Sequence, residues 1–494
     1  MEPAPVSSAP VAAPHAGGRL PSGAALPSAA VSETAWTRAH EELVELLREL
    51  IRIPSINPPD PPGPELDAAN HIAGVLATAG LRPQVFEPFP GRGSVTARLR
   101  GDGTGGEPLL LLSHLDVVPA QPDGWTHPPF AGEVADGYVW GRGAVDMKAM
   151  VAYEVQVLRL LAARATDAGL DPATDPVPGL RRDVIFACTA DEEGGGLQGA
   201  GWLVEHHPEL LRAAGALNES GAVSMDLGGQ RFYPIQVAEK GMQVYRIAVR
   251  GTWGHGSMPR DDNAAVLASE VVTRLARPGE PRLTPVMARF LDGLGSALGD
   301  EQARLVQAIA GEDPRRSAIA LDALCEPAYS RVLRALLRDT ISPNVIHAGI
   351  KYNVIPGDAV VEVDVRFLPG TSPDDMREEI LARLGDLRPR CDVTVVLDLP
   401  PAEASVNSDL YRVLEDTVRA HDPDGVPLPV MAPFATDAKH LALLGVPTYG
   451  FAPLRLGPDD RFLELFHGVD ERVGLDALRW GLPVLYDVVA TYCG

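Results

Sequence analysis

The chain has 494 residues, of which 45% are hydrophobic and 22% are charged, as in an ordinary globular protein. A chain of this length exceeds one comfortable hydrophobic core, so two domains are expected. The formal net charge of −23 argues against nucleic acid or an anionic membrane as a partner.

Membrane insertion and a disulfide framework also find little support in the sequence. No stretch has the roughly 18 uncharged apolar residues of a membrane helix. The four cysteines are far apart and form no Cys-x-x-Cys pair, which fits a reducing compartment. Residues 1–31 are rich in Ala, Pro, Ser and Gly and predict a disordered tail without the features of a secretory signal. A soluble cytoplasmic protein is expected.

The first half of the chain alternates between helical and strand patterns. Apolar periodicity and short apolar runs predict helices over residues 43–51, 66–79, 147–163 and 197–205, and strands over 94–99, 109–113 and 183–189. Strands that alternate with helices indicate an α/β architecture.

The pattern changes after residue 240. Three further strands are predicted, over residues 243–250, 361–366 and 391–397. Ser372 opens a helix between the last two of them, with proline at the first helical position. This order predicts a small α+β domain over roughly 241–400, in which residues 284–340 form a helical elaboration. The larger domain would comprise residues 32–240 and 401–494, on either side of this insertion.

His114 and Asp116 lie where a buried strand leaves the predicted sheet. They belong to Ser-His-Leu-Asp-Val-Val-Pro, directly after the apolar residues 109–112, and side chains at i and i+2 of a strand point to the same face. Imidazole is a good zinc ligand, and a nearby carboxylate holds its second nitrogen in one orientation. On its own this pair is weak evidence for a metal site.

Four further motifs place acids or a histidine in loops. Read alone, Asp146 fits a capping residue, Glu219 fits a turn, and a solitary His467 is more often surface or core than ligand. Glu192 and Glu193 follow another acid at the end of a strand, where three like charges favour a cation or a solvated turn. Adjacent side chains diverge, so Glu193 would reach a metal while Glu192 faces the reacting water.

Taken together, two histidines and three carboxylates are what two metal ions need when one carboxylate bridges them. Two metals roughly 3.5–4 Å apart hold one hydroxide and lower the pKa of its parent water towards ~7. The ligands are oxygen and nitrogen only, which suits zinc, cobalt or manganese.

With these motifs in this order, the chain resembles the co-catalytic zinc peptidases that include glutamate carboxypeptidase, aminoacylase, succinyl-diaminopimelate desuccinylase and the Gly-X carboxypeptidases. The resemblance covers residues 36–494. It rests on the His114 motif, Asp-Gly-Trp-Thr-His-Pro-Pro-Phe at 123–130, Gly-Arg-Gly-Ala-Val-Asp-Met-Lys, Asp-Glu-Glu-Gly-Gly and His-Gly-Val-Asp-Glu-Arg. It implies a mixed-sheet catalytic domain with an inserted ferredoxin-like lid and dimerisation domain.

The resemblance also implies residue roles. The implied ligands are His114 and Glu219 for one zinc, Glu193 and His467 for the other, and Asp146 as the bridge. Asp116 would brace His114, and Glu192 would be the general base.

Inside the insertion, Gly-His-Gly-Ser-Met-Pro carries His255, which by resemblance reaches the active site of a partner subunit and steadies the oxyanion. A homodimer follows from that role. Asn353 and Arg366 match substrate-contacting positions, and Arg366 would form a two-pronged bond to a carboxylate, although on a wet strand face it equally fits plain surface. Relatives often have Gly-Gly where this chain has Phe434-Ala435, so the specificity of any one relative does not transfer.

The sequence therefore predicts a metal-dependent amidohydrolase or carboxypeptidase that cleaves an amide bond next to a free carboxylate, in N-acyl amino acids or short peptides. Hydroxide held between two divalent ions, zinc above all, would attack the carbonyl while Glu192 transfers the proton. The alternative on the same fold is an aminopeptidase or dipeptidase that holds a free amine. A non-catalytic binding protein would require the loss of a ligand or base, and none is missing.

Overall fold

A large mixed sheet forms the centre of the molecule. The computed structural model describes residues 26–57, 64–311, 313–457, 460 and 462–494. Among these residues, ten strands form the sheet in the order β1-β2-β6-β3-β7-β18-β9-β16, with β8 and β17 also paired to β9. The strands are β1 (Gln84–Phe89), β2 (Arg92–Leu99), β3 (Leu109–His114), β6 (Val184–Thr189), β7 (Gly215–Asn218), β8 (Met225–Leu227), β9 (Gln230–Glu239), β16 (Ala402–Glu403), β17 (Val426–Ala432) and β18 (Thr448–Gly450).

Strands β6, β3, β7 and β18 run parallel at the centre of this sheet. Leu109 and Leu111 of β3 join one hydrophobic core, whereas Leu110 and Leu112 join another on the opposite face. Because alternate side chains enter different cores, the apolar run predicted as a buried strand is covered on both faces.

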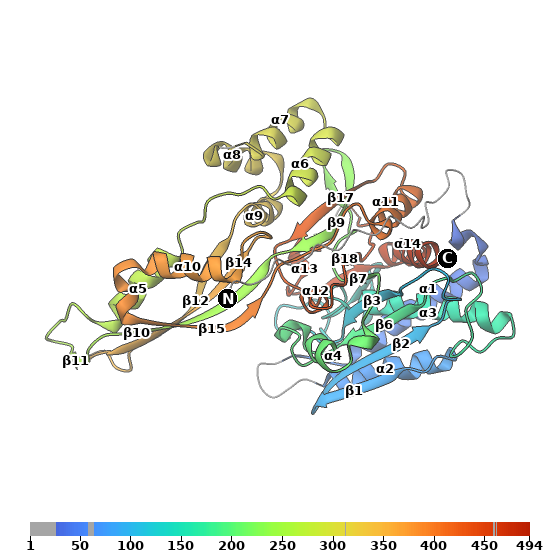
Figure 1. Ribbon diagram of the computed structural model, residues 1–494, viewed down its shortest axis with the longest axis horizontal. Coiled ribbons are helices and arrows are strands. Elements are labelled where there is room, and N and C mark those ends of the chain that lie inside the picture. Colours follow the sequence, from blue (N-terminus) through green and yellow to red (C-terminus); the bar gives the residue numbers. More distant parts are fainter. Residues whose placement is uncertain (1–25, 58–63, 312, 458–459, 461) are drawn as a thin grey trace, which may run out of the picture.

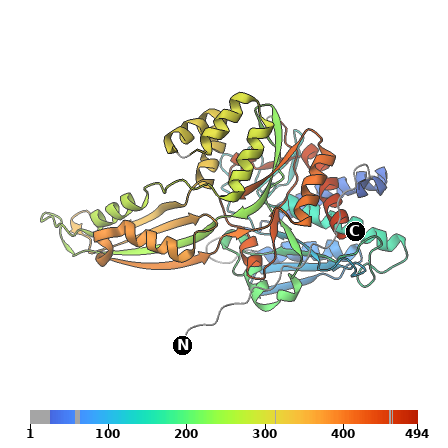
Figure 2. The same ribbon diagram turned by 45° about the horizontal axis from the view of Figure 1, so that its top comes forward.

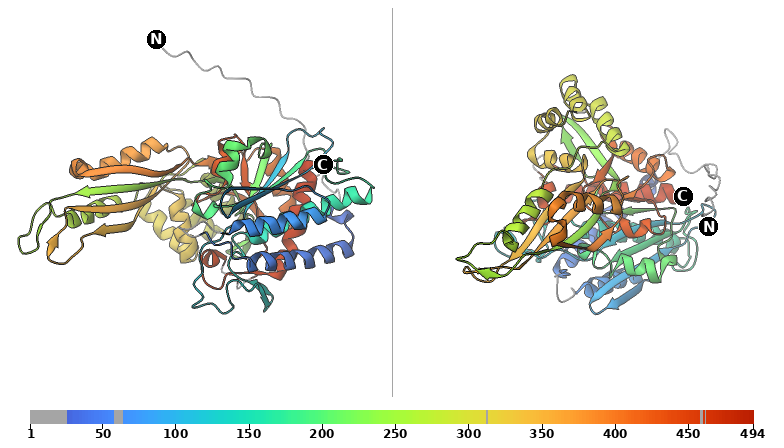
Figure 3. Two further views of the ribbon diagram at one scale, coloured as in Figure 1. Left: turned by 90° about the horizontal axis from the view of Figure 1, so that it is seen from below. Right: turned by 60° about the vertical axis from the view of Figure 1, so that its left-hand side comes forward.

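Helices cover both faces of the sheet. One face packs against α1 (Glu33–Arg52), α2 (Glu65–Thr78), α3 (Lys148–Asp167) and α14 (Leu475–Cys493), and the other carries α4 (Ala200–His206) and α12 (Ala438–Ala442). Helix α11 (Asp409–His421) packs against α14 and β17. In Figure 3 the blue helices α1 and α2 lie along one side of the sheet. The predicted α/β architecture is confirmed.

A second, four-stranded antiparallel sheet has the order β12-β14-β10-β15. Its elements follow the chain order β10 (Gly241–Arg250), α5 (Ala264–Leu275), β12 (Thr340–Ala348), β14 (Asp358–Phe367), α10 (Pro373–Leu384) and β15 (Cys391–Leu399). This β-α-β-β-α-β order is the ferredoxin-like arrangement that was predicted. Val361, Val363 and Val365 of β14 are buried under the two helices, and Ser372 caps α10 in a capping box with Asp375.

The helices between α5 and β12 pack against the large sheet. They are α6 (Pro285–Ala297), α7 (Asp300–Ile309), α8 (Pro314–Leu324) and α9 (Pro327–Leu336). Met287 and Phe290 of α6 share the larger core with Phe232 of β9. The sequence places this segment inside the insertion, but its apolar face is buried against the large sheet. Figures 1 and 2 show these yellow-green helices beside β17 and β9, while the smaller sheet extends away.

Short elements complete the fold. They are the sheet β4 (Glu133–Ala135), β5 (Tyr138–Trp140) and β19 (Arg472–Gly474), the pair β11 (Gly254–His255) and β13 (Val354–Ile355), the helix α13 (Phe462–Leu465), and the 3-10 helices η1 (Pro27–Ala30), η2 (Glu192–Gly194), η3 (Pro208–Leu210) and η4 (Gly385–Arg390). Among the described residues, no helix combines the length and apolarity that crossing a bilayer requires.

The expected tail over residues 1–31 lies partly outside the described residues, which begin at residue 26. Residues 27–30 form η1, and both the backbone N–H and the hydroxyl of Ser28 donate to buried Asp487 of α14. These residues of the predicted tail therefore adopt ordered structure, because a buried carboxylate of the last helix supplies acceptors that the local sequence does not reveal.

Candidate metal centre

The carboxyl ends of three central strands deliver four of the predicted site residues to one edge of the sheet. His114 is the last residue of β3, Glu192 and Glu193 follow β6, and Glu219 follows β7. Parallel strands end at the same edge, which is where open α/β sheets place their sites. Asp146 reaches this edge from the loop before α3.

Asp146 lies between two histidines. Its Oδ1 is 3.2 Å from His114 Nε2, and its Oδ2 is 3.3 Å from His467 Nε2. On the outer sides, Glu219 Oε2 is 3.8 Å from His114 Nε2, and Glu193 Oε2 is 3.2 Å from His467 Nε2. One oxygen of Asp146 thus lies beside the His114–Glu219 pair, and the other lies beside the His467–Glu193 pair.

These donors fit divalent cations. One group comprises His114, Glu192 and Glu219 and the other comprises Asp146, Glu193 and His467, with the ligand atoms within each group no more than 4.8 Å apart. Buried Glu193 Oε1 has no hydrogen-bond partner among the described residues. A buried carboxylate oxygen without a donor calls for a cation, so the residues present fit two metal ions with mixed nitrogen and oxygen ligands.

The electrostatics of the cluster point the same way. Burial raises the pKa of Glu193 to about 7 and also raises that of Glu219. Burial opposes ionisation of Asp146 too, but hydrogen bonds with His114 and His467 outweigh it and lower the pKa of Asp146. Hydrogen bonds with Asp146 and Glu193 raise the pKa of His467 to about 10. The acids therefore stabilise positive charge placed between them.

Asp116 organises the loop that carries the two glutamates. His114 Nδ1 is 3.1 Å from the backbone oxygen of Asp116 and 3.4 Å from its Oδ1. The same carboxylate accepts hydrogen bonds from the backbone N–H of Glu192 at 3.1 Å and of Glu193 at 3.0 Å. Asn57 donates to it at 2.7 Å. Asp116 therefore links the end of β3 to the loop after β6, and Asn57 is a supporting residue that sequence reasoning missed.

Glu471 fixes the loop that carries Asp146. This fully buried carboxylate accepts hydrogen bonds from the backbone N–H groups of Gly143, Val145 and Asp146 at 2.8–3.1 Å and from Arg142 Nη1 at 2.6 Å. Sequence reasoning quoted its motif, His-Gly-Val-Asp-Glu-Arg, for the histidine alone. Glu471 lies two positions before Val473, which pairs with β5. No local sequence pattern marks such a buried acid, so its role is visible only in the folded structure.

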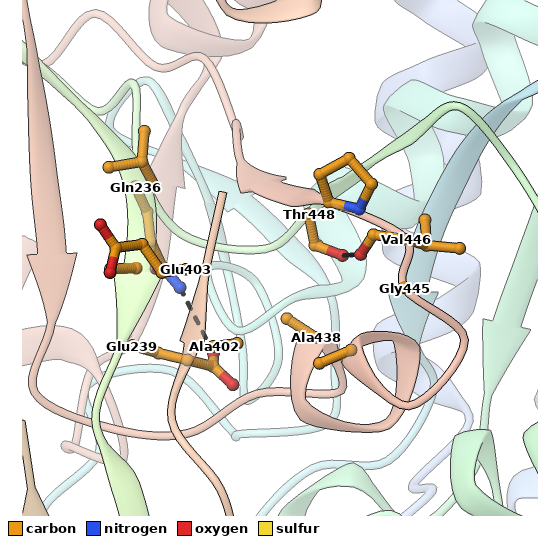
Figure 4. A pocket seen from close by; sticks show the side chains of 12 residues that line it. Gln236, Glu239, Ala402, Glu403, Ala438, Gly445, Val446 and Thr448 are labelled. Carbon is orange, nitrogen blue, oxygen red and sulfur yellow. Dashed lines mark hydrogen bonds between the residues drawn. The ribbon is translucent and has the colours of Figure 1, made fainter. Parts of the chain in front are cut away.

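The loop between β17 and α12 closes the site on another side. Glu192 Oε1 is 3.7 Å from Lys439 Nζ. Behind this loop, Glu239 accepts hydrogen bonds from the backbone N–H of Thr436 at 3.0 Å and from its hydroxyl at 2.8 Å. Glu239 and Ala438 line a cavity of about 180 Å³, and Figure 4 shows both side chains. Sequence reasoning assigned no role to Glu239, Thr436 or Lys439.

The other three predicted site residues belong to the insertion. His255 is exposed on β11, at the far end of the smaller sheet in Figure 1, and contacts Ser257 Oγ at 2.8 Å. The carbonyl oxygen of Asn353 accepts a hydrogen bond from Gly256 at the same end. Arg366 donates to both oxygens of Asp364, at 2.8 and 3.0 Å. The structure thus unites the metal-ligand candidates, whereas His255 and Asn353 lie at the far end of the smaller sheet and Arg366 pairs with Asp364.

Comparisons with known proteins identify the family of this chain. A sequence model of peptidase family M20/M25/M40 matches residues 110–491. Human N-fatty-acyl-amino acid synthase/hydrolase PM20D1 is 29% identical over 430 residues, which cover 84% of this chain and 79% of that protein. Probable carboxypeptidase S-like 2 of Dictyostelium discoideum is 29% identical over 408 residues, covering 78% and 71%.

A solved structure shares the fold. The M20 family metallo-carboxypeptidase Sso-CP2 from Sulfolobus solfataricus superposes with a TM-score of 0.66 at 17% identity, covering 91% of this chain and 99% of that one. The family match spans most of the chain, including every candidate metal ligand. This chain therefore belongs to peptidase family M20/M25/M40 and is a metal-dependent hydrolase.

Proposed function

We propose that this protein hydrolyses an amide bond next to a free carboxylate, in N-acyl amino acids or short peptides, with two divalent ions at the centre. The observation that carries the proposal is Asp146, whose two oxygens face His114 and His467 at 3.2 and 3.3 Å, with Glu192 beside them. The names of the two curated relatives, an N-fatty-acyl-amino acid hydrolase and a carboxypeptidase, support this substrate class.

The residues divide into ligands and a proton carrier. His114, Glu219, Glu193, His467 and the shared Asp146 would hold the two ions. When bound, such ions acidify a shared water and polarise the scissile carbonyl. Glu192 accepts the proton of the attacking water at its carboxylate and passes it to the departing nitrogen. Asp116 keeps the backbone of Glu192 in place through its 3.1 Å hydrogen bond.

The finer parts of the proposal concern metal, assembly and location. A donor set of imidazole and carboxylate suits zinc, with cobalt or manganese as the alternatives. His255 is exposed and remote from its own centre, which supports a homodimer in which it serves the partner's site, and Asn353 lies beside it. The boundaries 32–240, 241–400 and 401–494 belong to this proposal. The four free cysteines fit a cytoplasmic location.

A dipeptidase or aminopeptidase is the second candidate, and two observations favour it, one at Arg366 and one at Asp437. Arg366 already pairs with Asp364, so its guanidinium is not open to a substrate carboxylate. Asp437 is buried with Oδ1 lacking a partner among the described residues, and such an acid would anchor a free amine.

Metal removal and paired substrates test the proposal. Treatment with a chelator should abolish turnover, and added zinc should restore it. The restored enzyme should cleave N-acyl amino acids faster than free dipeptides, since a free carboxylate and an acylated nitrogen are the features proposed for its substrate. Faster cleavage of free dipeptides would favour the second candidate, and turnover that survives complete metal removal would overturn both.

Substituting Glu192→Ala tests the proton carrier. Turnover should fall by about 10²-fold or more because proton transfer is lost, while metal content stays at that of the unaltered protein. Glu205→Ala, an exposed glutamate of α4, is the matched control and should leave turnover unchanged. Loss of metal together with turnover would instead identify Glu192 as a ligand, which its place beside His114 and Glu219 makes a meaningful outcome.

A further inference from the structure

Three lysines are buried in this chain, and one of them differs from the other two. Lys148 Nζ donates to the carbonyl oxygens of Leu50 and Ile53 at 2.8 and 2.9 Å. Lys240 Nζ donates to two carbonyl oxygens and a hydroxyl at 2.9–3.2 Å. These two ammonium groups satisfy local backbone acceptors, which explains their burial.

Lys439 has no such acceptor. Its side chain is 2% exposed, and its only recorded partner among the described residues is Glu192 Oε1 at 3.7 Å. Burying an ammonium group without hydrogen bonds is strongly unfavourable unless nearby charges offset it. Glu192 provides the strongest charge interaction with Lys439, followed by Asp437 and Glu239. The ammonium is therefore held in place by acids of the site and not by local backbone.

The backbone under Lys439 is fixed to the strands that carry the metal-ligand candidates. Asp437 Oδ2 accepts a hydrogen bond from Thr189 Oγ1, at the end of β6, at 2.7 Å. Thr436 Oγ1 accepts one from Asn218 Nδ2, at the end of β7, at 2.9 Å. Glu239 holds Thr436 from the side of the cavity in Figure 4. Lys439 therefore starts from a rigid base tied to the ends of both strands.

We propose that Lys439 is a positioning residue, whose ammonium group holds the carboxylate of Glu192 in the orientation needed for proton transfer. The inference rests on the proposed function, because it assigns Lys439 to the proton carrier of that reaction. Glu192 has neighbours of its own sign in Glu219 and Asp437, which push its carboxylate away. An attractive charge on the opposite side confines the carboxylate, and small displacements of a reacting group reduce rates strongly.

Lys439→Met removes the charge and keeps most of the apolar volume. Turnover number should fall by about 100-fold, with KM within about twofold, because the substitution misplaces a group that acts in the chemical step and not in substrate binding. Metal content should stay at that of the unaltered enzyme. Lys439→Arg restores a cation and should recover at least about tenfold of the loss. Affinity for the amino-acid product, measured by calorimetry, should be unchanged in all variants.

Lys240→Met is the matched control, a buried lysine whose acceptors lie away from the metal centre. It should lower the melting temperature and leave the turnover number within about twofold. If Lys439→Met fails to fold, Lys439→Gln and Lys439→Arg carry the test, since the inference requires arginine to be the more active of the two.

Three results would overturn the inference. The first is an unchanged turnover number in Lys439→Met. The second is a rise in KM with weakened product binding, which would make Lys439 a substrate anchor. The third is a loss of metal. A different result would overturn the proposed function, namely turnover that is retained in Glu192→Ala. An inactive Glu192→Ala beside a fully active Lys439→Met would leave the proposed function standing and remove only the role of Lys439.

Discussion

Asp146 shows how one residue defines the centre. Its carboxylate faces one histidine on each side, at nearly equal distances of 3.2 and 3.3 Å. A lone aspartate before a helix has many uses, and the sequence alone left a capping role open. The two histidines beside it support the proposed role of Asp146 as the shared ligand of two ions, since a carboxylate has lone pairs on both oxygens.

Glu239 gives a pH-dependent prediction at the same scale. Burial raises the pKa of Glu239 from 4.5 to about 7. Between these values the folded protein holds the proton that the unfolded chain has released, so the contribution of this group to stability falls as pH rises from 4.5 to 7. Glu239→Gln does not titrate and keeps an oxygen for Thr436. Relative to the unaltered protein, its free energy of unfolding should improve by up to about 3 kcal/mol between pH 4.5 and pH 8.

Urea denaturation at a series of pH values, with the same added metal, measures this difference. Glu403→Gln is the control, because Glu403 lines the same cavity but is exposed, and it should show no comparable trend. A difference between Glu239→Gln and the unaltered protein that stays constant with pH would contradict a raised pKa at Glu239.

At the scale of elements, the loop from Gly141 to Met147 depends on a distant acid. Glu471 receives three backbone N–H groups of this loop and the guanidinium of Arg142. Glu471→Gln removes the charge and one acceptor oxygen, so at least one buried donor loses its partner. Groups that orient a ligand typically contribute 10–100-fold to metal affinity.

We therefore expect Glu471→Gln to bind zinc about 10–100-fold more weakly and to be less stable to urea. Titration with a competing chelator measures the affinity. Asp470→Asn is the control. The carboxylate of Asp470, next to Glu471 in the sequence, accepts hydrogen bonds from Thr126 and, among the described residues, from none in the loop of Asp146. Equal affinities for Glu471→Gln and the unaltered protein would show that the loop holds its shape without this carboxylate.

At the scale of the whole molecule, the position of His255 makes assembly testable. His255 sits at the far end of the smaller sheet, and large apolar side chains around it are exposed, with Tyr352 96% and Met258 66% accessible. Exposed apolar groups of this size at one end of a domain are typical of an interface. If this histidine serves the partner subunit's site, each complete site takes His255 from one chain and its remaining residues from the other.

Mixing two inactive variants tests this arrangement. Glu192→Ala and His255→Ala homodimers should each be weakly active, and refolding them together should restore about a quarter of the activity, since half of the random dimers contain one complete site. Each variant refolded alone is the control. Absence of recovery in a mixture shown to contain heterodimers would place the histidine and the glutamate in the same chain's site or remove the histidine from catalysis.

The sequence by itself determined the architecture and the set of candidate ligands. Apolar periodicity and runs located the central strands and helices, and valines alternating with polar residues over 361–366 marked a strand with one buried face. Motifs in glycine-rich or strand-end loops named the five ligand candidates, and the resemblance to a family gave their expected roles. These features are local in the sequence.

Only the tertiary structure decided which distant groups support the centre. Helices over residues 285–336 pack on the large sheet although they lie within the insertion, since their apolar faces find a larger core there. Asn57 and Glu471 contact partners that lie 59 and 329 positions away in the sequence. Lys439 faces an acid from another part of the fold. Burial and pairing at such separations depend on the folded chain, so no local pattern of residues encodes them.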